Sequence, residues 1–261
     1  MMLSLWTAAT GMQAQALNVD VISNNLANSN TAGYKAGRAN FQDLMYQQVT
    51  APGSQNSSGN QVPTGIQVGM GVRTAGVERM FSEGSFQQTG NPMDMAIQGH
   101  GFFQVLLPNG ELAYTRSGNF SVDSQGQLVT AAGYVVQPAI TIPSDATKVQ
   151  VASDGTVSVV QPGNNINNVG QLQLANFSNP AGLDAIGQSL FQQTPASGAP
   201  ITGTAGINGL GTIGQGMLEM SNVSAVQEMV SLIAAQRAYE MNSKTIQASD
   251  QMLQSTNQIV H

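Results

Sequence analysis

Both ends of the chain carry a seven-residue apolar repeat that the middle lacks. Near the N-terminus the repeat consists of Leu5, Met12, Val19 and Leu26. Near the C-terminus it consists of Leu232, Tyr239, Ile246 and Leu253, and it continues at Val260. Such spacing makes a narrow apolar stripe along a helix, and a stripe of this kind packs against another helix. The sequence therefore predicts two terminal helices that meet each other or meet neighbouring copies, with these residues in the seam.

The first helix is expected over residues 1–33, where Gly33 can adopt the left-handed geometry of a helix C-terminus. Residues 34–45 remain apolar-periodic, so a further helical turn or two is expected there. The second helix is expected to begin at the capping-box pattern Ser224–Gln227 and to run to the end of the chain without Pro or Gly.

The middle of the chain has the pattern of β structure. Residues 47–65 are rich in Pro, Gly, Ser, Asn and Gln, which predicts a loop, a linker or an extended segment. Across residues 66–218, Asn109-Gly110, Asp154-Gly155 and 123–126 separate short apolar runs, as hairpin turns do. Short strands with Gly-rich turns indicate an antiparallel sheet, a sandwich or an open barrel.

The expected fold class is α+β, with paired terminal helices forming a coiled-coil-like inner domain and a β-rich middle domain. Residues 1–35 and 221–261 would form the helical domain, and residues 71–220 the β domain. Residues 36–70 would connect the two and would include an extended stretch over residues 46–66.

Composition favours a subunit of a larger assembly. Only 8% of residues are charged, far below the usual quarter, and Asn and Gln supply about a fifth of the chain. The net charge is −6 with eight basic residues, which argues against a nucleic-acid surface. The chain has no Cys, no apolar run long enough to span a membrane and no pattern of a cleavable signal at its start.

Residues that could support catalysis or bind a cofactor are sparse. His100 and His261 have no second ligand at metal-binding spacing, and Ser85 and Ser117 lack a nucleophile-elbow pattern. No obvious pair of carboxylates is present. The sequence therefore predicts no catalytic residue, no metal and no cofactor.

Gly209, Gly211 and Gly214 satisfy a dinucleotide-binding pattern of glycines. That pattern needs a preceding strand and a following helix, whereas the residues after Gly214 look like a strand or a loop. We therefore expect no nucleotide site here.

Three long segments resemble bacterial flagellar rod and hook proteins. SNNLANSNTAGYK (residues 23–35) resembles their N-terminal signature, residues 221–253 resemble their C-terminal signature, and residues 97–138 are similar to their shared β domain. The residues that match the two terminal signatures are Asn25, Asn28, Thr31, Gly33, Tyr34, Lys35, Arg237 and Tyr239.

Within this family the chain most resembles the distal-rod members, with a proximal-rod protein as the alternative. Its length leaves no room for the outer insertion typical of hook proteins, and residues 46–66 resemble a stretch that separates distal rod from hook. The resemblance implies an inner tube of terminal helices with the β domain outside, built by contacts that propagate rather than close. The product would be a rigid hollow shaft that transmits torque from motor to hook across the periplasm.

The resemblance also implies partners and a route of export. The partners would be further copies of this chain, proximal rod proteins, the hook or its junction, the bushing rings of the basal body and the flagellar type III export apparatus. Export would need no cleaved signal. Phe41 and Met45 match the Phe-x-x-x-hydrophobic pattern of early export substrates, although Phe41 would equally suit a buried position on a helical turn.

Two other classes of function remain to be tested against this one. An enzyme acting on peptidoglycan would hydrolyse purified cell wall, but the chain shows no acid–base pair. A monomeric secreted binding module would have protease-resistant termini in dilute solution, whereas a rod subunit would have labile ones.

Overall fold

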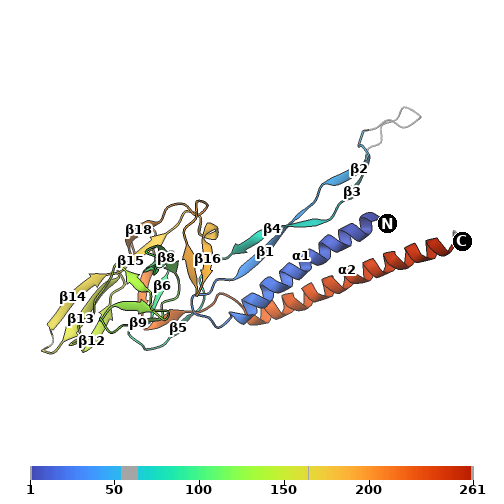
Figure 1. Ribbon diagram of the computed structural model, residues 1–261. Helices are drawn as coiled ribbons and strands as arrows, with labels where there is room; N and C mark the ends of the chain where they lie inside the picture. Colours follow the sequence, from blue (N-terminus) through green and yellow to red (C-terminus); the bar gives the residue numbers. More distant parts are fainter. Residues whose placement is uncertain (1, 54–63, 164, 260–261) are drawn as a thin grey trace. The chain divides into compact units, whose positions relative to one another are not determined.

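The computed structural model describes residues 2–53, 64–163 and 165–259 (Figure 1). Val260 and His261 therefore lie outside the described residues. The chain forms two compact units. The helical unit comprises Met1–Leu26, Gly37–Glu78 and Ser224–His261, and the β unit comprises Ala27–Ala36 and Arg79–Val223.

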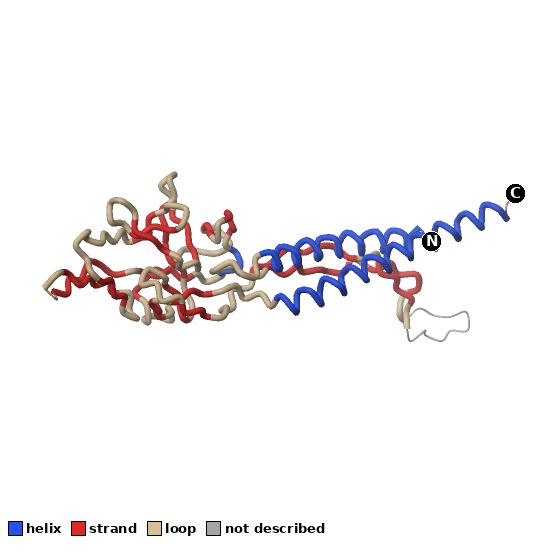
Figure 2. Tube along the Cα trace, turned by 90° about the horizontal axis from the view of Figure 1, so that it is seen from below, coloured by secondary structure: helices blue, strands red, loops and turns tan. Residues whose placement is uncertain are grey.

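The helical unit contains two antiparallel helices, α1 (Met2–Ala27) and α2 (Ala225–Ile259), which lie side by side in both views (Figures 1 and 2). The paired terminal helices predicted from the sequence are confirmed. The backbone N–H of Glu228 donates to the carbonyl of Ser224 at 3.0 Å, which starts α2 at the expected capping position. However, α1 ends at Ala27 rather than near residue 33, because the chain after it forms turns.

Two contacts define the register between the helices. The amide nitrogen of Asn25 lies 3.4 Å from a carboxylate oxygen of Glu228, and a Cβ added at Gly11 would lie 3.0 Å from the amide nitrogen of Asn242. The helices have 35 and 26 residues, so α2 is longer by 35 − 26 = 9 residues, or roughly 13 Å at 1.5 Å per residue. Its C-terminal end extends past the start of α1 (Figure 2).

The helical unit also contains a two-stranded β ribbon. In it β1 (Gly37–Asp43) pairs with β4 (Val72–Arg79), and β2 (Tyr46–Thr50) pairs antiparallel with β3 (Ile66–Gly69). The ribbon contacts α1: the N–H of Val72 donates to the hydroxyl of Thr10 at 3.4 Å.

The further helical turns expected over residues 34–45 are wrong, because β1 occupies most of this segment. The apolar residues Ala39 and Phe41 alternate with polar ones, which is the period of a strand. The amide group of Asn25 then holds the start of the strand: it donates to the carbonyl of Gly37 and accepts from its N–H, both at 2.8 Å.

The β unit is built from short antiparallel strands and one short 3₁₀ helix, η1 (Pro180–Gly182). The strands are β5 (Phe86–Gln88), β6 (Met95–Gln98), β7 (Phe102–Leu106), β8 (Leu112–Thr115), β9 (Phe120–Val122), β10 (Leu128–Thr130), β11 (Val135–Gln137), β12 (Lys148–Val151), β13 (Thr156–Gln161), β14 (Asn165–Gln171), β15 (Gln173–Asn176), β16 (Asp184–Gly187), β17 (Leu190–Gln192), β18 (Ile201–Thr204), β19 (Thr212–Gln215) and β20 (Met217–Glu219).

The largest sheet has nine strands in the order β16-β17-β8-β7-β11-β10-β9, with β15 pairing both β7 and β18. A separate sheet has the order β12-β13-β14, and β19–β6 and β20–β5 form pairs. The three predicted hairpins are confirmed as β7–β8, β9–β10 and β12–β13. The Gly-rich segment before Gly214 runs directly into β19, so a strand follows it, as expected.

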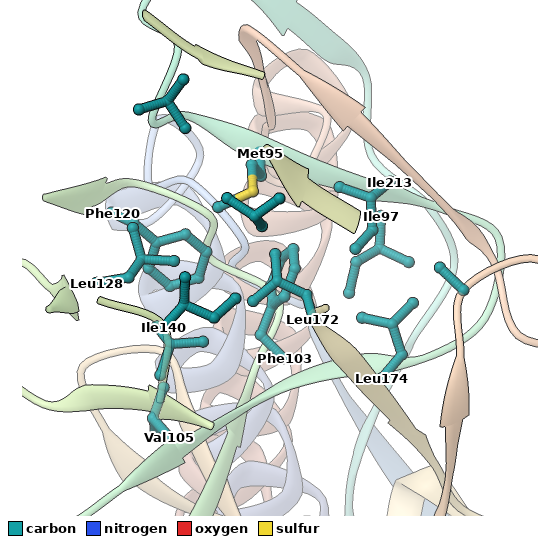
Figure 3. Packing of buried hydrophobic residues seen from close by; sticks show 14 of the residues in the cluster. Met95, Ile97, Phe103, Val105, Phe120, Leu128, Ile140, Leu172, Leu174 and Ile213 are labelled. Carbon is teal, nitrogen blue, oxygen red and sulfur yellow. The ribbon is translucent and has the colours of Figure 1, made fainter. Parts of the chain in front are cut away.

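The core of the β unit is aliphatic and joins several sheets (Figure 3). Phe103, Val105, Ile97 and Leu172 are completely buried there. A second cluster is aromatic, with Phe102, Tyr114, Phe177, Phe191 and Phe81 in edge-to-face contacts. This core keeps the β unit compact on its own.

Candidate functional site

The buried face of α2 in the helical unit is made of small residues. Ala235 and Ser249 are almost fully buried. Four of the eight predicted seam residues lie on α2 and are less covered: Leu232 and Ile246 are half-buried, whereas Tyr239 and Leu253 are exposed. Since a single copy leaves this stripe partly open, its role in packing between copies stays a prediction.

The same pattern appears on α1. Its buried positions include Ala8, Ala14 and Ile22. The four predicted seam residues of this helix, Leu5, Met12, Val19 and Leu26, are all half-buried. The buried positions of α1 therefore combine two alanines with Ile22, and the four heptad side chains are less covered.

The outward face of α2 carries an apolar patch that the heptad analysis missed. Val226, Val230 and Ile233 are 70%, 63% and 52% exposed, respectively. Their spacing of four and three residues puts them on one side of the helix. On α1 the single Trp of the chain, Trp6, is 59% exposed. Exposed apolar groups at such density mark interaction surfaces in soluble proteins.

The β ribbon adds a second exposed apolar surface. Val49 on β2 and Ile66 on β3 are both more than half exposed. The two export-pattern residues lie nearby: Phe41 is half-buried on β1, and Met45 is exposed between β1 and β2. The remainder of the stretch 46–66 includes residues 54–63, which lie outside the described residues.

The residues of the N-terminal signature organise local backbone in their own units. In the helical unit the side chain of Asn25 forms two hydrogen bonds with the backbone of Gly37, as described above. In the β unit the N–H of Thr31 donates to the carbonyl of Asn28 at 3.1 Å, and the guanidinium of Arg79 lies 5.4 Å from the ring centre of Tyr34. Of the C-terminal signature, Arg237 and Tyr239 are both exposed on α2.

Gly33 is the most constrained residue of this signature. Its φ is +71°, and its N–H donates to the carbonyl of Glu219 at 2.8 Å. The left-handed geometry predicted for Gly33 is present, but it lies in the turns after α1 rather than at the helix end. A Cβ at this position would lie 2.4 Å from the backbone nitrogen of Ser117, so only glycine fits without a rearrangement.

Lys35 belongs to a buried ion cluster in the β unit. Its ammonium lies 2.5 Å from one carboxylate oxygen of Glu219, and a guanidinium nitrogen of Arg116 lies 3.2 Å from the other. The Lys35 ammonium also donates to the carbonyl of Ser82 at 2.7 Å, and the N–H of Gly84 donates to Glu219 at 3.1 Å. All three charged side chains are at most 2% exposed.

Burial lowers the pKa of Lys35 below its ordinary value, while the charge of Glu219 opposes that shift. Burial also lowers the pKa of Arg116. The sequence singled out Lys35 through its signature but missed Glu219 and Arg116, which lie 184 and 81 positions later. A single sequence contains no signal that links residues so far apart.

One surface hollow of the β unit is lined by uncharged side chains. A cavity of about 390 Å³ is lined by hydroxyl, amide and apolar side chains, with Tyr134 at its wall, and none of its lining residues is charged or a histidine. Ser117 at this cavity donates to the amide oxygen of Asn119 at 2.6 Å rather than to a base. His100 follows β6, and its carbonyl accepts from Gly211 at 2.7 Å.

Within the described part of the chain, no group of three or more His, Asp or Glu side chains is arranged to hold a metal ion. The described helices include none that is both long enough and apolar enough to cross a membrane.

Three family models match the chain. Residues 5–35 match the "Flagella basal body rod protein" model, and residues 96–159 match the "Flagellar hook protein FlgE/F/G D1 domain". Residues 215–259 match the "Flagellar basal body rod FlgEFG protein C-terminal" model. The matches fall on α1 and its turns, on the β unit and on α2.

Over nearly its whole length the chain is similar to rod proteins of the flagellar basal body. It is 55% identical to "Flagellar basal-body rod protein FlgG" of Caulobacter vibrioides, over 99% of both chains. It is 48% identical to the protein of that name from Borreliella burgdorferi, over 99% of both, and 38% identical to that of Bacillus subtilis, over 97% of both. The chain belongs to the flagellar basal-body rod protein family, as the three signatures predicted.

Proposed function

We propose that this protein is a structural subunit of the flagellar distal rod, whose copies polymerise into a rigid hollow shaft that transmits torque from motor to hook across the periplasm. The observation that carries the proposal is the outward apolar face of α2, formed by Val226, Val230 and Ile233. A chain with its own well-packed β core has no folding reason to leave such a face in water. A neighbouring copy would cover it.

Helix packing between copies would supply the cohesion. Fully burying an aliphatic side chain of this size contributes about 1.5–3 kcal/mol, so the three outward residues of α2 form a substantial contact for each subunit. The half-buried seam residues around Leu232 and Ile246 would close the remaining gaps. With a net charge of only −6 spread over 261 residues, copies can stack without strong electrostatic repulsion.

The ribbon stretch 46–66 would act as a brace between neighbouring subunits. Its exposed side chains, among them Val49 and Ile66, are apolar enough to pack on another copy. A two-stranded ribbon is marginally stable alone, which favours such a contact. The same shaft would require contacts with proximal rod proteins, the hook or its junction, the bushing rings and the export apparatus.

We infer a structural rather than a catalytic role. The uncharged lining of the cavity of about 390 Å³ supports this, since cleavage of a glycan or peptide needs an acid–base pair or an activated nucleophile. A proximal-rod position within the same family is the alternative. Electron microscopy of basal bodies from cells that lack this protein separates the two, because a distal subunit leaves a shortened shaft without a hook.

Three matched substitutions test the helical interface in the purified full chain. Ile233→Asp places a charge on the outward face of α2, and Ile246→Asp places one on the half-buried stripe. Ile166→Asp, at a 65% exposed position of β14, is the control. We expect the first two to abolish filaments seen by electron microscopy, while circular dichroism shows the β unit still folded.

Each outcome has its own meaning. Normal filaments with Ile233→Asp would remove the outward face from the interface, and normal filaments with Ile246→Asp would remove the seam. Equal loss in all three variants, including Ile166→Asp, would indicate a general effect of added charge rather than a helical contact.

A further inference from the structure

All sulfur atoms of the chain are thioether sulfurs of methionine. The sequence has 13 Met and no Cys. Among the described side chains, the thioethers that are at least 45% exposed all lie in the helical unit: Met45, Met229, Met241 and Met252. By contrast, Met95 in the core of the β unit is 1% exposed (Figure 3).

Three of these methionines lie on α2, and all three side chains are exposed in the single copy. Met229 lies six residues before the buried Ala235 and Met241 six residues after it, so the two side chains flank the buried direction of α2 on opposite sides, each about 120° from it. Met252 lies 11 residues beyond Met241, close to three full turns, and so repeats its direction. Met229 is also adjacent to Val230 in the outward apolar patch.

We propose that Met229, Met241 and Met252 form an oxidation-sensitive site that prevents assembly of the free subunit when a peroxide converts them to sulfoxides. The inference rests on the proposed polymerisation, because the site acts only where these side chains enter a contact between copies. In the reaction a lone pair of the thioether sulfur attacks a peroxide oxygen. The O–O bond breaks, an S–O bond forms, and the peroxide is reduced to water.

The change alters the contact rather than the fold. A thioether is flexible and apolar and fills irregular gaps between packed helices, whereas a sulfoxide is polar and needs a hydrogen-bond partner when buried. Because the three side chains are exposed in the single copy, oxidation leaves the α1–α2 contact intact. Once copies cover these side chains, the formed polymer resists the same oxidant.

A first experiment maps the reaction on the unassembled full chain. Dilute hydrogen peroxide is added, and peptides are quantified by mass spectrometry over time. We expect Met229, Met241 and Met252 to oxidise at least tenfold faster than Met95. If Met95 reacts as fast as the three α2 residues, the site is not defined by exposure and the proposal fails.

A second experiment measures assembly after oxidation. We expect peroxide treatment to raise the protein concentration needed for filaments at least tenfold, and treatment with both methionine sulfoxide reductases to restore the original value. The triple variant Met229→Leu/Met241→Leu/Met252→Leu keeps apolar side chains and should assemble with or without peroxide.

The matched control is Met45→Leu/Met70→Leu, which removes two thioethers from the ribbon and leaves α2 unchanged. It should remain as sensitive as the unmodified chain. If the α2 triple variant still loses assembly on oxidation, or if the ribbon variant becomes resistant, the sensitive site lies elsewhere and the proposal is overturned.

The two levels of inference fail differently. Should the oxidised chain form filaments as readily as the untreated one, only the oxidation site is refuted and polymerisation stands. Should the untreated chain form no filaments under any condition, the proposed function itself fails, and the oxidation site falls with it.

Discussion

The ammonium of Lys35 lies 2.5 Å from the carboxylate of Glu219, and both side chains are fully buried. The contact joins the turns that follow α1 to β20, the last strand of the β unit, across 184 positions of sequence. Arg116 approaches the same carboxylate at 3.2 Å, so two buried cations share one buried anion, and the charge of Glu83 adds a further attraction to both. Such a cluster requires every member, because a single removal leaves charge uncompensated in the interior.

Removing the shared anion tests this dependence. Glu219→Gln is nearly isosteric but removes the carboxylate that Lys35 and Arg116 share. We expect a loss of about 3–5 kcal/mol in the free energy of unfolding of the β unit. Urea unfolding of the full chain measures it, with the exposed Asp184→Asn as the control. A loss below about 1 kcal/mol would mean that the cluster contributes little.

Gly33→Ala should destabilise the β unit more than a comparable substitution elsewhere. The left-handed backbone alone costs alanine about 1–2 kcal/mol, and here the new Cβ would also lie 2.4 Å from the nitrogen of Ser117. Gly110→Ala isolates the backbone contribution, because Gly110 has a φ of +83° and no atom within 4 Å of its added Cβ. Thermal unfolding compares the two, and equal losses would contradict the steric contribution.

The β ribbon should weaken in acid. A hydrogen bond from Asn40 and then one from Arg38 lower the pKa of Glu78 below its ordinary value. A carboxylate with a depressed folded-state pKa contributes stability that is present above its unfolded pKa and is lost as pH falls through the folded value. The protection factors of the amides in β1 and β4, which are corrected for the intrinsic pH dependence of exchange, should therefore fall below about pH 4.5.

The same measurement on Glu78→Gln provides the reference for this pH effect. A neutral amide cannot titrate, so its exchange should depend less on pH across that window. Identical pH profiles for the two chains would show that Glu78 does not cause the acid sensitivity of the ribbon.

Trp6 reports assembly without a label, because it is the only Trp in the chain and is 59% exposed. If neighbouring helices cover α1, its fluorescence emission should shift to the blue as filaments form. The assembly-deficient Ile233→Asp should keep the red-shifted emission at all concentrations. Filaments without any shift would place Trp6 on a surface that the polymer leaves in water.

Deleting residues 46–66 tests the proposed brace. The deletion removes β2 and the first residue of β3 but retains both helices, so filaments should still form. We expect them to bend more easily, measured as a shorter persistence length in electron micrographs. An unchanged straight rod would identify the segment as a plain linker.

Local chemistry explains what could be predicted from the sequence. The hairpins at Asn109-Gly110 and Asp154-Gly155 were predictable because a short hairpin loop of this kind needs a residue in the left-handed conformation, and glycine supplies it in both loops. The start of α2 near Ser224 was predictable because the capping box is also a pattern of neighbouring residues. The family signatures supplied the pairing of the two helices.

Other features depend on packing that no short segment encodes. The alternation around Ala39 and Phe41 is too brief to exclude a helix, and only the contacts of Asn25 and Glu78 with β1 decide for a strand. The heptad stripe pointed to Tyr239, whereas the single copy buries Ala235 instead. Small residues allow close helix contact but carry little hydrophobic signal in a sequence. Glu219 and Arg116 become partners only after the sheets have formed.

The greater length of α2 has a consequence for how a filament grows. With Asn25 opposite Glu228 and Gly11 opposite Asn242, the start of α1 falls opposite about residue 251, so the last turns of α2 project alone. A subunit with one bare helical tip has two different ends along its axis. If copies stack as proposed, the filament inherits this polarity, and we expect subunits to join its two ends at different rates.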